Sequence, residues 1–243
     1  MATLVMATMT GAQASELKLI AGGSLAGLFR ELGPLFEKAS GYTLSIHFDA
    51  TPNIISRINS GTPFDAVVIP FDVFKDSAAK ERLTDPIEIA RVGYGVIVRA
   101  GAAKPDLSTA DAFKKSLLAA SSVASVPASA AGAYVTKVYE RLGIADEMKA
   151  RTKVEALPTA IAPSVAKGEA ELGVFLTNVF NAPGVELAGA FPADLQQELV
   201  FAAAIAKDAK ATGAAKALLD FLKTPPAVAA IKAAGMTPAP HTD

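Results

Sequence analysis

The chain has 243 residues, of which 51% are hydrophobic, so it can bury one large core or the cores of two lobes. Its formal net charge of -1, with both signs interspersed, excludes a strongly basic surface for nucleic acid or anionic membranes. Cysteine is absent, which excludes disulfides and thiolate metal sites. Of the two histidines, His241 lies in the C-terminal tail, and we interpret His47 as a structural residue on a strand. We therefore expect no metal and no cofactor.

The N-terminal residues differ in character from the rest of the chain. Residues 1–10 are apolar and small, and Ala12-Gln13-Ala14 fits a small-x-small signal-peptidase site. Because a charged n-region is missing, we interpret residues 1–14 as the remnant of an export signal, with a disordered leader as the alternative. No later run is long and apolar enough to span a bilayer. The pattern predicts an exported, periplasmic protein.

The first part of the chain alternates strands with helices. A continuous or alternating apolar pattern predicts strands, and apolar residues at helical spacing predict helices. Strands are expected at 17–20, 42–48 and 64–70, and helices from Ser24 to Phe36, at 54–60 and at 71–80. This β-α-β-α-β-α order predicts a parallel sheet with right-handed crossovers.

A second α/β lobe follows a long strand at 88–99, whose internal glycines suggest the crossing between lobes. Its expected helices span 108–119, begin after Gly132, and run from a start at 157–160 to an end at 167–168. Its expected strands are at 122–126, 151–156 and 172–176. Strands at 185–187 and 199–206 and helices at 209–222 and 226–234 close the chain. We expect residues 16–92 plus 201–238 to form lobe 1 and 93–200 to form lobe 2, with hinge strands near 90–95 and 198–203.

Four turns lead from a strand into a helix, two in each lobe. In the first, Gly22-Gly23 leaves the backbone bare, and Ser24 is placed as the helix N-cap. In the second, Thr51 is placed as N-cap and Pro52 as the first helical residue. The helix starts near Ser129 and Thr159 complete the set. Each turn could be an ordinary capped turn. If all four converge, their N–H groups and hydroxyls form a site for a compact anion.

Catalytic motifs are missing from the chain. There is no GxSxG, Walker loop, GxGxxG or HExxH sequence. Asp49, Asp65 and Asp72 lie near strand ends, but capping and solvation explain them better than catalysis. Arg91, near the expected crossing, could be a surface salt bridge or a clamp on a carboxylate. We therefore expect a binding protein rather than an enzyme.

The chain resembles the extracytoplasmic molybdate-binding proteins of ABC importers, which have the two-lobed type II periplasmic binding fold. The resemblance runs from Leu17 to Pro238. It is carried by Ala21-Gly22-Gly23-Ser24-Leu25, residues 57–67 (RINSGTPFDAV), Ala131-Gly132-Ala133-Tyr134 with Arg141-Leu142-Gly143, and residues 167–173 (KGEAELG). It implies an α/β fold in which each lobe is a mixed, mainly parallel sheet flanked by helices.

The resemblance also implies ligand positions, and several of them are altered. The family's first serine matches Ser24, beside Gly23, and its alanine N–H at the third turn matches Ala131. The second serine falls at Thr51 or Pro52. The fourth donor falls at Pro158, which has no N–H, so Thr159 would substitute, and the family's tyrosine falls at Leu176. These departures suit a divergent member, and a carboxylate ligand would give Arg91 more weight.

The expected function is the solute-binding component of an ABC importer. It would close on a molybdate- or tungstate-type oxyanion, deliver it to a membrane permease and act as a monomer. Two alternatives on the same scaffold are a receptor for a small carboxylate and an exported enzyme, such as an isomerase or hydrolase of small acids. A third, the effector domain of a LysR-type regulator, is disfavoured because DNA-binding helices are missing.

Overall fold

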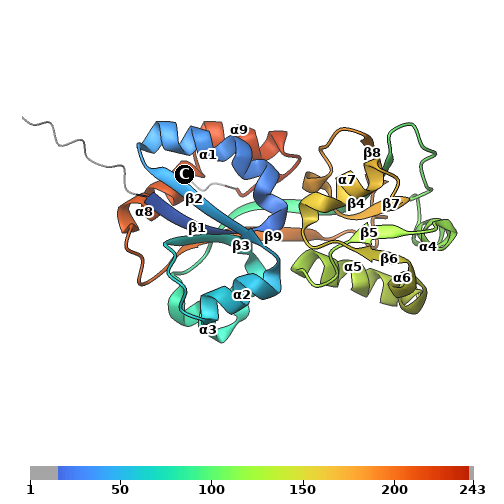
Figure 1. The fold of residues 1–243 in the computed structure, drawn as a ribbon, viewed down its shortest axis with the longest axis horizontal. Helices are drawn as coiled ribbons and strands as arrows, with labels where there is room; N and C mark the ends of the chain where they lie inside the picture. The colour runs from blue at the N-terminus through green and yellow to red at the C-terminus, as the bar shows by residue number, and fades with distance from the viewer. Residues whose placement is uncertain (1–15, 241–243) are drawn as a thin grey trace, which may run out of the picture.

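The structure, a computed structural model, describes residues 16–240. The expected export signal at 1–14 and His241 lie outside the described residues. Two α/β lobes lie side by side, and the strands β4 and β9 run between them (Figure 1). The predicted two-lobed α/β architecture is thereby confirmed.

The first lobe is built on three parallel strands. Strand β1 (Glu16–Gly22) lies between β2 (Thr43–Asp49) and β3 (Ala66–Pro70). Helices α1 (Ala26–Ser40) and α2 (Thr51–Asn59) connect these strands and cover opposite faces of the sheet (Figure 1). The other helical elements of this lobe include η2 (Phe71–Lys75), α3 (Ser77–Arg82), α8 (Thr212–Phe221) and α9 (Pro225–Ala233).

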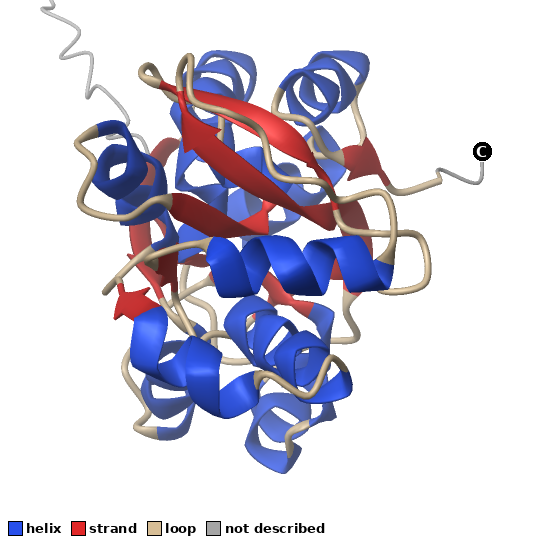
Figure 2. Ribbon diagram, turned by 90° about the vertical axis from the view of Figure 1, so that its right-hand side faces the viewer, coloured by secondary structure: helices blue, strands red, loops and turns tan. Residues whose placement is uncertain are grey.

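The second lobe repeats this α/β construction. Its sheet has the order β4-β7-β5-β6, in which β5, β6 and β7 are parallel. Helices pack around the sheet, as the end-on view shows (Figure 2). The elements are α4 (Ala110–Ala119), β5 (Val123–Ser125), α5 (Ala130–Arg141), α6 (Ala145–Arg151), β6 (Thr152–Val154), η3 (Pro158–Ala160), α7 (Ile161–Ala166), β7 (Leu172–Leu176), η4 (Thr177–Val179) and β8 (Val185–Ala190).

The strand β4 (Ile87–Arg99) belongs to both lobes. Residues 87–93 pair with β9 (Glu198–Ile205), while residues 94–98 pair with β7. Strand β9 also pairs with β3, and the short β10 (Thr237–Pro238) pairs with β4. At the change of partner, the Gln196 side chain accepts from the Tyr94 N–H and donates to its carbonyl, both at 2.9 Å. The Gln196 side-chain amide thus makes the hydrogen bonds that a neighbouring strand would make, at the point where β4 crosses between the lobes.

Two predicted helix caps are wrong. The 3₁₀ helix η1 (Gly23–Leu25) precedes α1, so the long helix begins at Ala26 and no side chain caps either start. Thr51 is the first residue of α2, and Ala50 occupies the N-cap position. Pro52 is therefore the second helical residue, where its missing N–H is still harmless.

Two differences concern the second lobe. Helix α4 begins at Ala110 rather than at residue 108, and Thr109 caps it by accepting a hydrogen bond from the Ala112 N–H. Helix α6 is missing from the prediction, and the strand expected at 151–156 shortens to β6. Only Met148 of α6 is buried, so the helix lacks the repeated apolar spacing that predicts one.

An unpartnered hydroxyl lies where β4 enters the second lobe. Tyr94 is fully buried, with its ring 4.8 Å from that of Tyr134 and 5.6 Å from that of Phe191. Its hydroxyl has no hydrogen-bond partner within residues 16–240, and burial raises its pKa. By contrast, the Tyr134 hydroxyl donates to the Leu195 carbonyl at 2.7 Å.

The two tyrosines predict opposite effects of the same substitution. Tyr94→Phe removes a buried hydroxyl that has no partner among the described residues, so we expect the free energy of unfolding to rise by about 1 kcal/mol. Tyr134→Phe removes a formed hydrogen bond, and we expect a loss of about 1 kcal/mol. Urea unfolding followed by circular dichroism measures both. Equal losses in the two variants would contradict the assignment.

Candidate functional site

A small cavity lies between the lobes at the carboxyl ends of the first-lobe strands. The residues predicted to bind that line it are Gly23, Ser24, Thr51, Ser129, Ala131 and Pro158. They come from η1, α2, the start of α5 and η3, so the four predicted turns do meet. The cavity volume is about 20 Å³, enough for about one water molecule.

The first turn approaches the opposite lobe closely at Gly23. A Cβ added there would lie 3.2 Å from Pro158 Cδ and 3.4 Å from the Asp49 carbonyl oxygen. A bare backbone is therefore what lets η1 and η3 meet. The Ser24 hydroxyl has no hydrogen-bond partner among the described residues, although the residue is only 8% exposed. It is available to a bound anion.

Two hydrogen bonds join the two lobes beside the cavity. Thr51 Oγ1 accepts from the N–H of Ala130, the first residue of α5, at 3.0 Å. Asn178 Nδ2 donates to the Ser24 carbonyl at 2.8 Å. Each bond connects a residue of one lobe to a residue of the other, so the two lobes are closed on each other. Some hydrogen-bond donors near the cavity are therefore already used within the protein.

The third turn provides a capped helix start. Ser129 is the N-cap of α5, and its Oγ accepts from the Gly132 N–H at 3.0 Å while donating to the Val126 carbonyl at 2.8 Å. Its hydroxyl proton is thus already engaged. Ala131 lies in the first turn of α5, and the N–H groups of a first turn have no hydrogen-bond partner within their own helix. This backbone group can donate to an anion.

The remaining predicted residues do not line the cavity. Pro52 and Thr159 are exposed on the surface of α2 and η3. Leu176 is fully buried in the core at the end of β7, opposite Tyr94. Arg91 makes two hydrogen bonds to the Glu88 carboxylate instead of facing the cavity. The carboxylate clamp at Arg91 stays a prediction without support from the geometry.

Several lining residues were missed by the sequence reasoning. Phe175 lines the cavity where Leu176 was expected. Adjacent strand residues point to opposite faces, so an offset of one position exchanges a cavity residue for a core residue. Ala50, Pro70 and Leu199 were also missed, and Gly22 and Asp49 were noted near strand ends without being assigned to the site. Gly22, Asp49 and Pro70 end strands β1, β2 and β3, a signal that could have identified them.

Asp49 is the titratable residue of the cavity wall. Burial disfavours its charge, but hydrogen bonds from the Asn53 amide, the Ala50 N–H and the His47 ring outweigh burial and lower its pKa. A carboxylate of lowered pKa is a weak base, because efficient general bases have pKa values near the operating pH. Asp49 therefore suits a structural role better than proton abstraction.

The other acidic candidates lie elsewhere. Asp65 is buried and accepts hydrogen bonds from backbone N–H groups, and Asp72 forms an exposed ion pair with Lys75. Neither lines the cavity. Within residues 16–240, no group of three or more His, Cys, Asp or Glu side chains could hold a metal ion. Among these residues, no helix has the length and apolarity that crossing a bilayer requires.

Comparison with known proteins identifies relatives over almost the whole chain. Residues 17–237 match the family model of bacterial extracellular solute-binding proteins. An aconitate isomerase from Pseudomonas sp. is 31% identical, over 93% of this chain and 89% of that protein. The molybdate-binding protein ModA of Azotobacter vinelandii is 29% identical, over 92% and 90% of the two chains.

Solved structures give the same picture of the fold. The periplasmic molybdate-binding protein of Azotobacter vinelandii superimposes with a TM-score of 0.74 at 21% identity, over 93% of this chain and all of that chain. Together with the sequence matches, this structural similarity confirms the prediction that the chain is a divergent member of the molybdate-binding protein family.

Proposed function

Because the chain belongs to the bacterial extracellular solute-binding proteins, we propose that it binds a small organic anion carrying several carboxylates in the cleft between its lobes. The observation that carries this proposal is the chemistry of the cavity wall. Hydroxyl groups and first-turn N–H groups line it, and its one charged lining side chain, the Asp49 carboxylate, is already engaged by the Ala50 N–H and the Asn53 amide. Such a wall stabilises a fully ionised anion through neutral dipoles.

A carboxylate is favoured over a tetrahedral oxyanion on two grounds. Pro158 forms part of the wall without an N–H, and Leu176 has no hydroxyl and lies in the core, so the donor set implied by the molybdate-binding proteins is reduced. The relative at 31% identity is named for aconitate, a tricarboxylate, whereas the molybdate-binding relative is 29% identical.

Binding requires the lobes to open, because the closed cavity holds about one water molecule. The crossing strands are the natural hinge, with lobe 1 at residues 16–92 plus 201–238 and lobe 2 at 93–200. The hinge strands near 90–95 and 198–203 include Gly93, where β4 changes partner. On closure, the ligand replaces the Thr51–Ala130 hydrogen bond, and the Ala130 N–H donates to a carboxylate instead.

The partner of this receptor would be the membrane permease of an ABC importer, to which a monomer in the periplasm delivers the anion. The family match supports this assignment. A molybdate- or tungstate-type ligand stays the nearest alternative, supported by the molybdate-binding relatives.

A thermal-shift series with the full chain tests the ligand class. We expect trans-aconitate or citrate at a hundredfold excess over its dissociation constant to stabilise the fold by about 2.7 kcal/mol. For a chain of this size that corresponds to about 5–10 °C. Ser24→Ala should reduce the shift, while the exposed Thr159→Ala should not. A shift with molybdate and tungstate alone would identify an oxyanion receptor and contradict the proposal.

The aconitate isomerase relative also favours a second candidate, an enzyme that isomerises such an acid. The lowered pKa of Asp49 argues against this reaction, because Asp49 is the only acid in the cavity lining. Incubating the protein with trans-aconitate and following the cis isomer by ¹H NMR separates the two. Turnover that Asp49→Asn abolishes would establish the enzyme, and binding without turnover would establish the receptor.

A further inference from the structure

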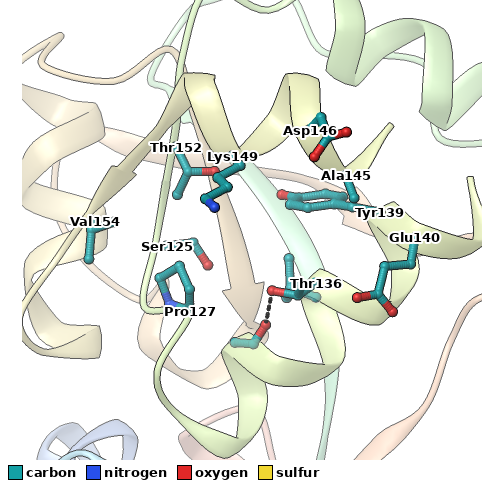
Figure 3. Close-up of a pocket in the computed structure, with 12 residues that line it drawn as sticks. Ser125, Pro127, Thr136, Tyr139, Glu140, Ala145, Asp146, Lys149, Thr152 and Val154 are labelled. Atoms are coloured by element: carbon teal, nitrogen blue, oxygen red, sulfur yellow. Dashed lines mark hydrogen bonds between the residues drawn. The ribbon is translucent and has the colours of Figure 1, made fainter. Parts of the chain in front are cut away.

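A second and much larger cavity lies wholly within the second lobe. It is open to solvent and bordered by β5, β6, α5 and α6, and its volume is about 480 Å³. This falls within the range of about 300–1,000 Å³ that is usual for small-molecule sites. It shares no lining residue with the cavity between the lobes. Figure 3 shows the side chains around it.

One buried polar group in this cavity lacks a partner. Tyr139 is 5% exposed, and its hydroxyl has no hydrogen-bond partner within the described part of the chain. The hydroxyl points across the cavity toward Lys149 (Figure 3). Burial raises the pKa of Tyr139, so the group stays protonated and can donate. An unsatisfied buried donor is costly, and an acceptor placed in the cavity would remove that cost.

A cation lies beside this donor. Lys149 is in the last turn of α6, and its ammonium group points into the same space, toward Ser125 and Pro127 (Figure 3). No carboxylate within residues 16–240 lies within ion-pair distance of it, so its charge is available to a ligand. An ammonium group and a phenolic hydroxyl together match one carboxylate.

The other lining residues determine which further chemical groups the ligand can have. Val135, Pro127 and Val154 give an apolar surface, and Val154 is 68% exposed at the end of β6. Glu140 and Asp146 also line the cavity, so a second negative charge on the ligand would be repelled.

We propose that this cavity is a second binding site, which takes a small monocarboxylate with an apolar body. The carboxylate lies between the Lys149 ammonium group and the Tyr139 hydroxyl, and the apolar body packs on Val135, Pro127 and Val154. This site and the cleft would prefer different ligands, because the cleft is proposed to take acids with several carboxylates.

The test uses 3-phenylpropionate and the full chain labelled with 3-fluorotyrosine. The chain has four tyrosines, so its ¹⁹F spectrum is simple, and the loss of one signal in Tyr139→Phe assigns that residue. We expect the Tyr139 signal to shift on titration to millimolar concentration. Phenylsuccinate, which adds a second carboxylate, should bind more weakly.

Matched variants separate this site from the cleft. Lys149→Met should weaken 3-phenylpropionate binding about tenfold, since it removes a charge-assisted hydrogen bond. Lys137→Met removes the same charge from α5 outside the cavity and should have no effect. Ser24→Ala, in the cleft, should also leave binding unchanged. An unmoved Tyr139 signal, equal affinity in Lys149→Met, or binding lost in Ser24→Ala would each overturn the proposal.

Discussion

Replacing Gly132 with alanine is expected to lower the free energy of unfolding by about 3 kcal/mol or more. A Cβ at this position would lie 1.8 Å from the Val126 carbonyl oxygen and 2.7 Å from Pro127 Cα. These atoms belong to the backbone, so no side-chain rotation can relieve the overlap. The start of α5 would have to move, which also breaks the hydrogen bond between the Gly132 N–H and Ser129 Oγ.

Gly27→Ala is the matched control for this prediction. Gly27 lies in α1, and a Cβ added there meets no atom within 4 Å. The same substitution should therefore be neutral or stabilising by about 0.5–1 kcal/mol, as usual for glycine in a helix. Urea unfolding of both variants measures the difference. A Gly132→Ala protein as stable as the Gly27→Ala protein would show that the turn before α5 is not rigid.

Asp65→Ala is expected to cost about 4 kcal/mol of unfolding free energy. The carboxylate is 5% exposed and accepts hydrogen bonds from the N–H groups of Lys18, Lys210 and Ala211, each at 2.9 Å. It thereby joins the start of β1 to the segment before α8. Hydrogen bonds to a charged group contribute about 1.5–3 kcal/mol each, and their loss leaves buried donors unpaired.

Two further variants resolve the origin of that loss. Asp65→Asn keeps the shape but turns one acceptor into a donor, so an intermediate loss of about 2 kcal/mol is expected. Asp72→Asn removes an exposed carboxylate that pairs with Lys75, and a change within about 0.5 kcal/mol is expected. Chemical denaturation provides the comparison. If Asp65→Ala were no more harmful than Asp72→Asn, the proposed connection between β1 and α8 would be wrong.

Sequence patterns predicted the elements whose signals are local. The apolar run of β3 and the helical spacing of α1 follow directly from periodicity and were confirmed. The turn at Gly22-Gly23 was also recognised, because two adjacent glycines before a helix mark a bare backbone. The start of α1 was missed by two residues, since the single 3₁₀ turn η1 has no periodicity of its own.

The parts that could not be predicted depend on contacts between distant residues. Thr51 was read as a cap for its own helix, but its hydroxyl accepts from Ala130, which is 79 residues away in sequence. For Asp65, capping or solvation is expected from the sequence, but its buried carboxylate accepts from the Ala211 N–H, 146 residues away. The orientation of Phe175 toward the cavity depends on strand register, which a single residue of offset reverses.

The hydrogen bond between Thr51 and Ala130 also affects how tightly any ligand can bind. If the ligand takes the Ala130 N–H as proposed, it has to displace the hydrogen bond that this group already donates to Thr51 in the closed protein. The apparent dissociation constant is the intrinsic one divided by the fraction of molecules that are open, so an open fraction of about 0.1 weakens binding about tenfold. Ligand affinity then has two contributions. One is the fit of the anion, and the other is the free energy with which the empty protein closes on itself.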